Sequence, residues 1–404
     1  MAQFLSDVIS DQVGIRELSA RLGEPAWLTD ARVAAYERYS KLPAPTDRSE
    51  GWRRLTFEYG VTPLQDRSQP NTPELWPTIE GSSPGVEAVR LHDAIKSHPD
   101  LVRMAIAKPL PAISLHKDLA LIEAGWQDGV FVRVADGCVV TEPLTFTYCE
   151  PPFTRTLIVV GAGACATIVE RHTETWSLGL SLTDVMIGDG AQVKFVYVQN
   201  TSSAGFFSVQ RARLGRDSKL TTLNFAIGGS FSKTDVEVDL NGQGAESDML
   251  GLVFGDKDQQ FDFHTLQGHR APDTRSDLLF KSALDGSSHS KYTGVISIGK
   301  DAPRSEAYQA NRNLLLSDDA RADTEPKLEI LIDDVARCTH GATIGPVDDE
   351  QLFYLRSRGL DTDTASRLIV EGFFQEVFHK VGDERVTADL AKMVAPHVER
   401  LGAH

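Results

Sequence analysis

The sequence predicts a mainly β protein in which a parallel β-helix, or solenoid, is flanked by α-helical regions at both ends. The middle of the chain, residues 123–345, is rich in Val, Ile, Thr, Phe and Gly, arranged in short apolar runs between polar turns. The two ends, residues 1–122 and 346–404, show apolar residues at helical spacing instead. Within the middle region a glycine recurs at a constant interval, at Gly161, Gly188, Gly215 and Gly242.

The glycine repeat is the strongest of these observations. A fixed period of roughly 20–50 residues is typical of a solenoid, because one coil cannot bury its apolar face alone whereas stacked coils bury a continuous core. We expect the four glycines to stack at one corner of successive coils, where a positive φ would let the strand turn sharply. Looser repeats follow at Asp285 and Ser317. An antiparallel β-sandwich with similar turns is the alternative fold.

The N-terminal region is predicted to contain helices joined by loops. Apolar spacing favours helices over residues 8–22 and 29–41, each followed by glycine or proline. Prolines are frequent over residues 62–85, which predicts a loop because proline fits neither a helix interior nor a central strand. Helical spacing returns over residues 89–108, with an interruption near Pro99.

The C-terminal region is predicted to form two helices with a docking surface. Asp348 is a candidate N-cap for the first helix, and Asp361 or Thr362 for a longer one. The longer helix is apolar on more than one face over residues 365–381, so we expect it to pack against its own domain and against a partner. A central helix of a small bundle is the alternative for this longer helix, and a solvated helix face is the alternative for Arg356 and Arg358 of the first one. The candidate partner-binding residues are Phe353, Tyr354, Arg356, Arg358, Phe373 and Phe374.

Composition and charge exclude several classes of function. The 404 residues carry a formal net charge of -16, and so acidic a surface repels nucleic-acid phosphates and anionic lipids. The sequence shows no long apolar run, and its first residues lack the basic segment followed by an apolar segment that is typical of a signal peptide. A cytoplasmic protein is therefore expected. The four cysteines form no C-x-x-C pair, which argues against a disulfide framework and a structural zinc site. Cys138, Cys149 and Cys165 lie in apolar segments and are expected to pack in the core.

A resemblance to a known family rests mainly on the stretch from Asn313 onward, NLLLSDDARADTEPKLEILIDDVARCTHGATIGPVDDEQLFYLRSRGL. This stretch resembles the SufB/SufD family, scaffold proteins of the SUF iron–sulfur cluster assembly system. Its core, CTHGATIG, resembles the SufD branch of that family. Weaker similarity covers nearly the whole chain, and residues 62–85 are the least typical.

The resemblance implies a right-handed parallel β-helix and a non-catalytic scaffold rather than an enzyme. It implies a heterodimer with SufB through the solenoid, and binding of SufC, an ABC-type ATPase, through the C-terminal helices. A homodimer is possible for the isolated chain. The sequence contains no G-x-x-x-x-G-K-[ST] motif, so any ATP hydrolysis would belong to a partner.

Cys338 and His340 are the candidate site for cluster assembly. Two residues apart on a strand, their side chains point to one face, and thiolate and imidazole both bind iron and zinc. A structural cysteine and a hydrogen-bonded histidine are the alternative. The resemblance implies that His340 lies at the SufB interface and takes part in assembly. Because a cluster normally takes four protein ligands, we expect no stable cluster on this chain alone, only a transient iron–sulfur cluster or iron shared with a partner.

Two rival functions stay open at this point. A β-helix enzyme that acts on polysaccharides, a usually secreted class, would use carboxylates such as Asp235, Glu237 and Asp239, which share one strand face. A SufB-like scaffold that builds the cluster itself would need further cysteines suited to carrying sulfur or iron.

His264 and His269 are not expected to share a metal ion. Five residues apart on a regular strand, they point to opposite faces, and a shared ion would need a turn at Gly268. Asp262 lies on the same face as His264 and is its expected hydrogen-bond partner.

Overall fold

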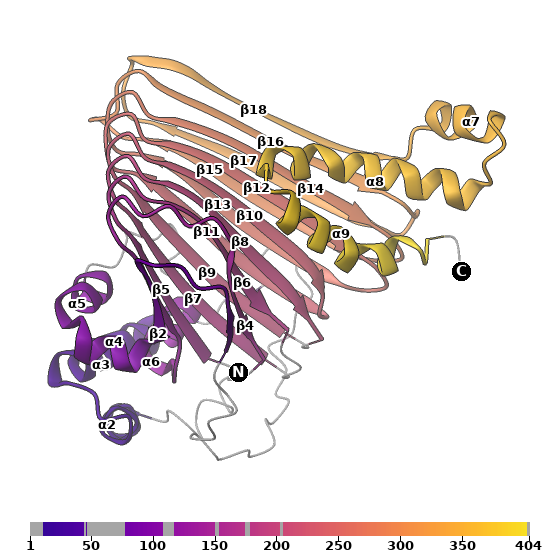
Figure 1. The fold of residues 1–404 in the computed structure, drawn as a ribbon. Coiled ribbons are helices and arrows are strands. Elements are labelled where there is room, and N and C mark those ends of the chain that lie inside the picture. Colours follow the sequence, from indigo (N-terminus) through magenta and orange to yellow (C-terminus); the bar gives the residue numbers. More distant parts are fainter. Residues whose placement is uncertain are drawn as a thin grey trace.

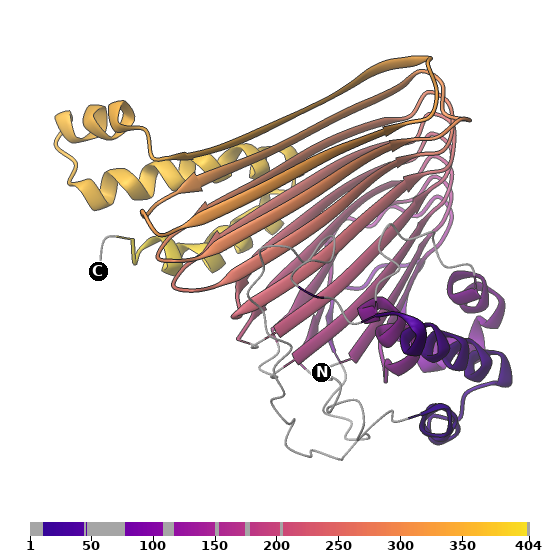
Figure 2. The same ribbon diagram turned by 180° about the vertical axis from the view of Figure 1, so that it is seen from behind.

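The structure, a computed structural model, describes residues 11–43, 46, 77–107, 117–149, 153–173, 178–202 and 205–401. Its centre is a β-solenoid built from two long sheets, with helices packed near both ends of the chain (Figures 1 and 2). The predicted fold class is confirmed, and the antiparallel sandwich is excluded because neighbouring long strands run parallel within each sheet.

Each coil of the solenoid contributes one strand to each of two nine-stranded sheets. Sheet A has the order β1 (Thr78–Glu80), β4 (Leu144–Tyr148), β6 (Cys165–His172), β8 (Gln192–Thr201), β10 (Lys219–Gly228), β12 (Glu246–Gly255), β14 (Arg275–Leu284), β16 (Ser305–Leu315) and β18 (Val335–Pro346). Sheet B has the order β17 (Arg321–Ile330), β15 (His289–Ile298), β13 (Gln260–His269), β11 (Phe231–Leu240), β9 (Gly205–Leu214), β7 (Leu178–Ile187), β5 (Phe153–Val160), β3 (Val130–Val134) and β2 (Val86–Arg90).

Helices flank this solenoid in two groups. The N-terminal group is α2 (Gln12–Arg21), α3 (Ala26–Lys41), α4 (Leu91–Ser97), α5 (Pro99–Ala107) and α6 (Lys117–Gly125). The C-terminal group is α7 (Asp349–Ser357), α8 (Thr362–Val381) and α9 (Glu384–Val398). Asp348 and Asp361 cap α7 and α8 as predicted, each accepting a hydrogen bond from a backbone N–H of the first turn.

The pairing register explains where the sequence repeat is visible and where it fades. Gln192 of β8 pairs with Lys219 of β10, at the same interval as the glycine repeat. The interval between paired residues is longer from Glu246 to Arg275, and longer again from Arg275 to Glu306. Coils near the C-terminal end are therefore longer, and the regular spacing is lost after the fourth glycine.

The four repeat glycines stack at one corner of successive coils, as predicted, but for a different reason. A Cβ added to Gly188 would lie 2.7 Å from the backbone nitrogen of Ala162, and one added to Gly242 would lie 2.3 Å from the carbonyl carbon of Gly215. The repeat glycines do not have the positive φ that we expected. Positive φ occurs two residues later, at Gly163, Gly190, Asp217 and Gly244. The repeat therefore marks the close approach of neighbouring coils.

The hydrophobic core fills the space between the two sheets, and helices cover parts of both outer faces. Helices α8 and α9 lie across the outer face of sheet A, where Val370, Phe374 and Val377 pack against strand residues such as Phe225. Helix α6 packs on β7 and β9 of sheet B, and α4 and α5 pack nearer its first strands. The last strands, β17 and β18, lie far from the N-terminal helices (Figure 2).

Several predicted boundaries in the N-terminal region shift, and one predicted element is wrong. Residues 86–90 form β2, an edge strand where sequence spacing had favoured the start of a helix at 89. Helix α3 begins at Ala26, three residues before the predicted start. Residues 8–10 and most of the proline-rich stretch 62–85 lie outside the described residues. In the described part of the chain, no helix is both long and apolar enough to cross a membrane.

Candidate functional site at the open end of the solenoid

The last coil of the solenoid ends the two sheets. Among the described residues, β17 pairs with β15 alone in sheet B, and β18 pairs with β16 alone in sheet A. Each strand therefore has one backbone edge without a strand neighbour. Such an edge is a ready template for pairing with another chain.

Cys338 and His340 both lie on β18, in this last coil. Cys338 pairs in register with Ala307 and His340 with Gln309, both of which are buried in the interior of the preceding coil. The two side chains therefore share the inner face of β18, as the spacing predicted. His340 is exposed, whereas Cys338 is half-buried against the cluster around Ile298. Burial raises the pKa of the Cys338 thiol, so the thiolate is disfavoured.

Large apolar side chains are exposed around this site. The exposed set is Leu328, Ile330 and Leu331 in and after β17, together with Ile344 in β18. In every earlier coil the equivalent inner face is covered by the next coil; Ile298, for example, pairs with Ile330 and is fully buried. Sequence analysis missed these four residues, because apolar residues of a last strand look like core residues of any other strand.

The C-terminal helices present a second exposed apolar surface. Helix α7 has no buried residue, and Phe353 and Tyr354 on it are 73% and 58% exposed. Arg356 and Arg358 are exposed beside them, with the Arg358 guanidinium 5.2 Å from the centre of the Tyr354 ring. Leu368 on α8 is also exposed and was not among the predicted residues.

Phe374 does not belong to that surface. It is 1% exposed and packs against sheet A, so its assignment to partner binding was wrong. Phe373 is half-buried beside it, with the Lys281 ammonium 4.5 Å from the centre of its ring. Most of the apolar surface of α8 is thus buried against other parts of the same chain.

Two of the other three cysteines do not pack in the core as expected, whereas Cys138 packs against the main core cluster. Cys149 and Cys165 are exposed, and Cys138 is half-buried. Cys165 is the first residue of β6, six strand spacings from β18 in sheet A, or roughly 29 Å at ~4.8 Å per spacing. The Cys149 and Cys165 thiols are therefore accessible but remote from Cys338. The described residues contain no group of three or more metal-binding side chains.

The predicted carboxylate row is buried and paired rather than open. Asp235, Glu237 and Asp239 share one face of β11 as predicted, and each is almost fully buried. Asp239 accepts a hydrogen bond from Arg270 at 2.9 Å, and Asp235 lies 3.9 Å from the Lys233 ammonium. A buried, ion-paired row does not offer the open groove that a polysaccharide would need.

The two histidines of β13 lie as predicted. His264 Nε2 is 3.3 Å from the carboxylate of Asp262, on the outer face of sheet B. His269 is buried on the opposite, inner face, where its ring nitrogens lie 2.8 Å from the hydroxyls of Thr274 and Ser276. Burial, together with the charge of Arg270, lowers the pKa of His269 to about 4 and keeps the ring neutral.

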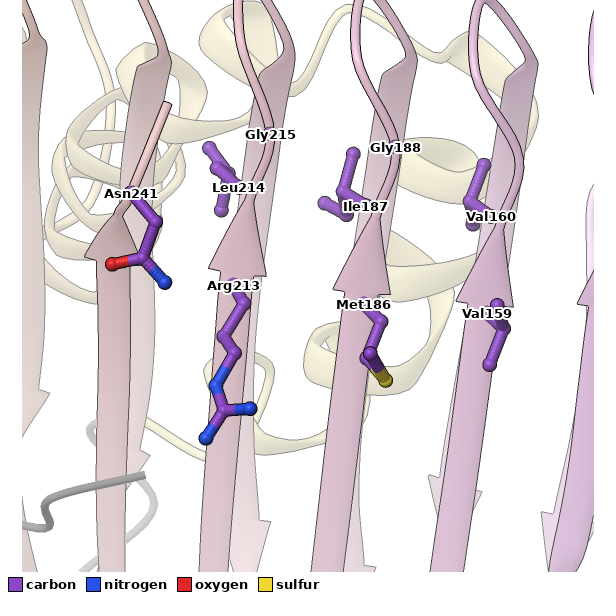
Figure 3. Close-up of a pocket in the computed structure, with 9 residues that line it drawn as sticks. All are labelled: Val159, Val160, Met186, Ile187, Gly188, Arg213, Leu214, Gly215 and Asn241. Carbon is purple, nitrogen blue, oxygen red and sulfur yellow. The ribbon is translucent and has the colours of Figure 1, made fainter. Parts of the chain in front are cut away.

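A shallow pocket of about 320 Å³ lies elsewhere, on the strand ends of β5, β7 and β9 in sheet B (Figure 3). Its wall is mostly apolar, with side chains such as Val159 and Met186, and Arg213 and Asn241 supply the polar groups. None of the predicted site residues lines it. Sequence analysis gave no signal for this pocket.

Comparison with known proteins connects the open-ended solenoid to one family. A family model described as the SufBD core domain of SUF system FeS cluster assembly matches residues 149–373, more than half of the chain. The match includes the last coil with Cys338 and His340.

Relatives agree with this match. An iron–sulfur cluster assembly SufBD family protein of Mycobacterium leprae is 34% identical over 260 residues, which cover 62% of each chain. A family member from Mycobacterium tuberculosis is 33% identical over 224 residues, covering 54% of this chain and 56% of its own. The matches thus span less than two thirds of the length of these two relatives. The iron–sulfur cluster assembly protein SufD of Bacillus subtilis is 28% identical over 429 residues, covering 96% of this chain and 98% of its own. The protein belongs to the SufBD family of the SUF iron–sulfur cluster assembly system.

Proposed function

We propose that this chain is a non-catalytic scaffold subunit for iron–sulfur cluster assembly. In this proposal it pairs with a SufB-type chain through the open end of its solenoid and binds a SufC-type ABC ATPase through its C-terminal helices. The observation that carries the proposal is the last coil, where two free strand edges, an uncovered apolar face and the Cys338–His340 pair lie together.

The cluster, as cargo, would be held between two chains. Cys338 and His340 supply at most two ligands, and the nearest other cysteine in sheet A, Cys165, is roughly 29 Å away by strand spacing. The raised pKa of Cys338 further weakens it as a ligand in the isolated chain. A partner seated on the open end would bring additional ligands opposite the exposed His340. This favours shared coordination over a scaffold that builds the cluster alone.

The ATPase would dock on α7 and the exposed side of α8. Exposed aromatic residues beside arginines are typical of interface centres, and Phe353, Tyr354 and Arg358 combine both. Helix α8 is in turn fixed to the solenoid, because Glu376 pairs with Lys281 at 2.6 Å and with Arg312 at 2.8 Å. Movement of the docked ATPase would therefore be transmitted to sheet A.

Co-expression of the tagged full chain with SufB-type and SufC-type chains tests this proposal. Phe353→Ser should cause loss of the ATPase from the purified complex while the SufB-type chain is retained. Gln351→Ala, on the same exposed helix, is the matched control and should keep both partners. Retention of the ATPase by the Phe353→Ser variant, or failure of the wild-type chain to bind a SufB-type chain, would contradict the proposal.

Deletion of residues 346–404 would be a poorer test of ATPase binding than a single substitution. Helices α8 and α9 cover apolar side chains on sheet A, including Leu223, Phe225 and Leu252. Removing them would expose this layer and favour aggregation. Substitutions on α7, which has no buried residue, avoid this problem.

A further inference from the structure

The pocket on sheet B has no role in the scaffold function proposed above. Its floor is a row of residues paired between neighbouring strands, Val159 of β5, Met186 of β7 and Arg213 of β9. Asn241, which follows β11, supplies a second polar side chain next to this row (Figure 3). Strand β9 is four strand spacings from β17, or roughly 19 Å at ~4.8 Å per spacing, so the pocket is separate from the open end.

The side chains of this row project from the outer face of sheet B. Their chain neighbours Val160, Ile187 and Leu214 belong to the core between the sheets, and successive side chains of a strand point to opposite faces. Val159 and Met186 are half-buried and pack against the cluster formed with α4 and α5. The floor of the pocket is therefore apolar over two strands and polar at the third.

The turn positions after the strands leave room for a ligand. Gly188 and Gly215 directly follow β7 and β9 and line the pocket, and they contribute no side chain to it. Asn241 takes the equivalent position after β11, where its N–H donates to Leu214 at 3.1 Å. A polar side chain thus lies at the edge of the recess, where the preceding coils have glycine.

Positive charge is concentrated on this part of the sheet, although the whole chain has a formal net charge of -16. Strands β3, β5, β7 and β9 contain four arginines and one acidic residue: Arg133, Arg155, Arg211, Arg213 and Asp184. Each shares the face of the pocket row, by register or by even spacing along its strand. An anion would therefore be attracted to this face.

The two carboxylates that act on Arg213 are bonded to other arginines. Asp184 lies 2.7 Å from Arg211, and Asp239, which pairs in register with Arg213, accepts a hydrogen bond from Arg270 at 2.9 Å. Burial lowers the pKa of Arg213, and the attraction of Asp184 and Asp239 does not cancel this effect. A ligand carboxylate in the pocket would compensate for the water that this guanidinium has lost.

We infer that the pocket binds a small carboxylate that carries an apolar chain. Arg213 and Asn241 hold the carboxylate, because a guanidinium matches its two oxygens and the amide adds a donor. The apolar chain lies over Met186 and Val159, in a pocket of about 320 Å³ whose few polar groups are all at one side. From Arg213 to Val159 the floor spans two strand spacings, or roughly 10 Å, which suits a chain of the length of octanoate.

Methyl NMR of the isolated full chain tests this site, because the sequence contains only five methionines. The methionine methyl groups are labelled, Met186→Leu and Met393→Leu assign two resonances, and octanoate or octanol is titrated. We expect octanoate to shift the Met186 resonance in a saturable way. The Met393 resonance should stay unchanged, since this half-buried methionine packs beside sheet A. Octanol, which has no charge, should bind at least tenfold more weakly.

Two arginine-to-glutamine substitutions separate the pocket from the general positive charge of this face. Arg213→Gln should weaken octanoate binding at least tenfold and octanol binding less than twofold, because it removes the charge and keeps the apolar floor. Arg216→Gln is the matched control, since Arg216 is exposed three residues further on and does not line the pocket. It should change both affinities less than twofold. Circular dichroism with thermal melting checks that both variants fold.

Four outcomes would overturn the inference. They are an unchanged Met186 resonance, equal shifts of Met186 and Met393, equal affinities for octanoate and octanol, and wild-type octanoate affinity in Arg213→Gln. The first three are measured on the wild-type chain and do not depend on the folding of a substituted pocket. No partner chain is present in these samples, so each of these outcomes would leave the proposed scaffold function intact.

Discussion

The two ends of the solenoid are built differently. At the first end, β1 and β2 run antiparallel to β4 and β3 and close the two sheets, while α4 and α5 pack alongside. Phe131 and Val132 of the first coil are fully buried there. At the last end, β17 and β18 have no such closing strand in the described part of the chain, and Ile330 and Ile344 are exposed.

The difference teaches how a stacked architecture is used. Each coil contacts only its neighbours, so the stack needs a closing element at each end to remain soluble. An uncovered end with free strand edges promotes aggregation if the chain stays alone. If another chain covers it, the same end serves as an interface. We interpret the closed end as structural and the open end as functional.

The largest expected effect concerns the stacking between the two ends. Gly188→Ala should destabilise the protein by roughly 3 kcal/mol, because the added Cβ would lie 2.7 Å from the backbone of the neighbouring coil. Gly190→Ala is the matched control: its φ is +67° but nothing lies within 4 Å, so only backbone strain of about 1 kcal/mol is expected. Urea denaturation measures both. Equal losses would show that the repeat glycines serve the turn rather than the close approach.

One chemical change made in two adjacent coils sharpens the comparison between covered and open positions. Ile298→Thr places a hydroxyl in a fully buried site and should cost about 2 kcal/mol of unfolding free energy. Ile330→Thr, at the paired position of the last coil, should cost less than about 0.5 kcal/mol because that side chain is 42% exposed. A large loss at Ile330 in the isolated chain would mean that another group covers the open end.

At the closed end a smaller, pH-dependent effect is expected from His92. Burial disfavours the charged ring, but hydrogen bonds to Asp128 and Glu24 outweigh it and raise the pKa of His92 above 6.5. Its stabilising contribution should be complete below pH 6.5 and be lost as the pH rises through the raised pKa. His92→Gln should therefore lower stability by about 1 kcal/mol at pH 5.5 and by less at pH 8.5. A pH-independent difference would assign His92 a packing role only.

Sequence patterns predicted the architecture well because it is repetitive. The glycines recur at a fixed spacing because each of the shorter coils has a position where a Cβ would clash with the neighbouring coil. Strand alternation alone was enough to predict that Cys338 and His340 share one face. The repeat was lost where coils lengthen, although the solenoid continues to β18.

The sequence could not predict which side chains are exposed, because exposure depends on which surfaces other parts of the chain cover. Cys165 lies in an apolar segment, yet it begins a strand and points outward, so composition gave the wrong burial. Phe353 and Phe374 are both aromatic residues in C-terminal helices, and only the docking of α8 on sheet A separates the exposed one from the buried one. The open end was missed because no local pattern tells which strand is the last.

The central claim is that the open end holds a cluster only together with a partner at His340. Anaerobic reconstitution with iron and sulfide, followed by absorbance spectroscopy, tests it on three samples: the isolated chain, its complex with the SufB-type chain, and the same complex carrying His340→Ala. Thr339→Ala, on the opposite face of β18, is the matched control. We predict a cluster in the wild-type and Thr339→Ala complexes, little in the His340→Ala complex, and none on the isolated chain. A stoichiometric cluster on the isolated chain, or an unchanged yield with His340→Ala, would contradict the claim.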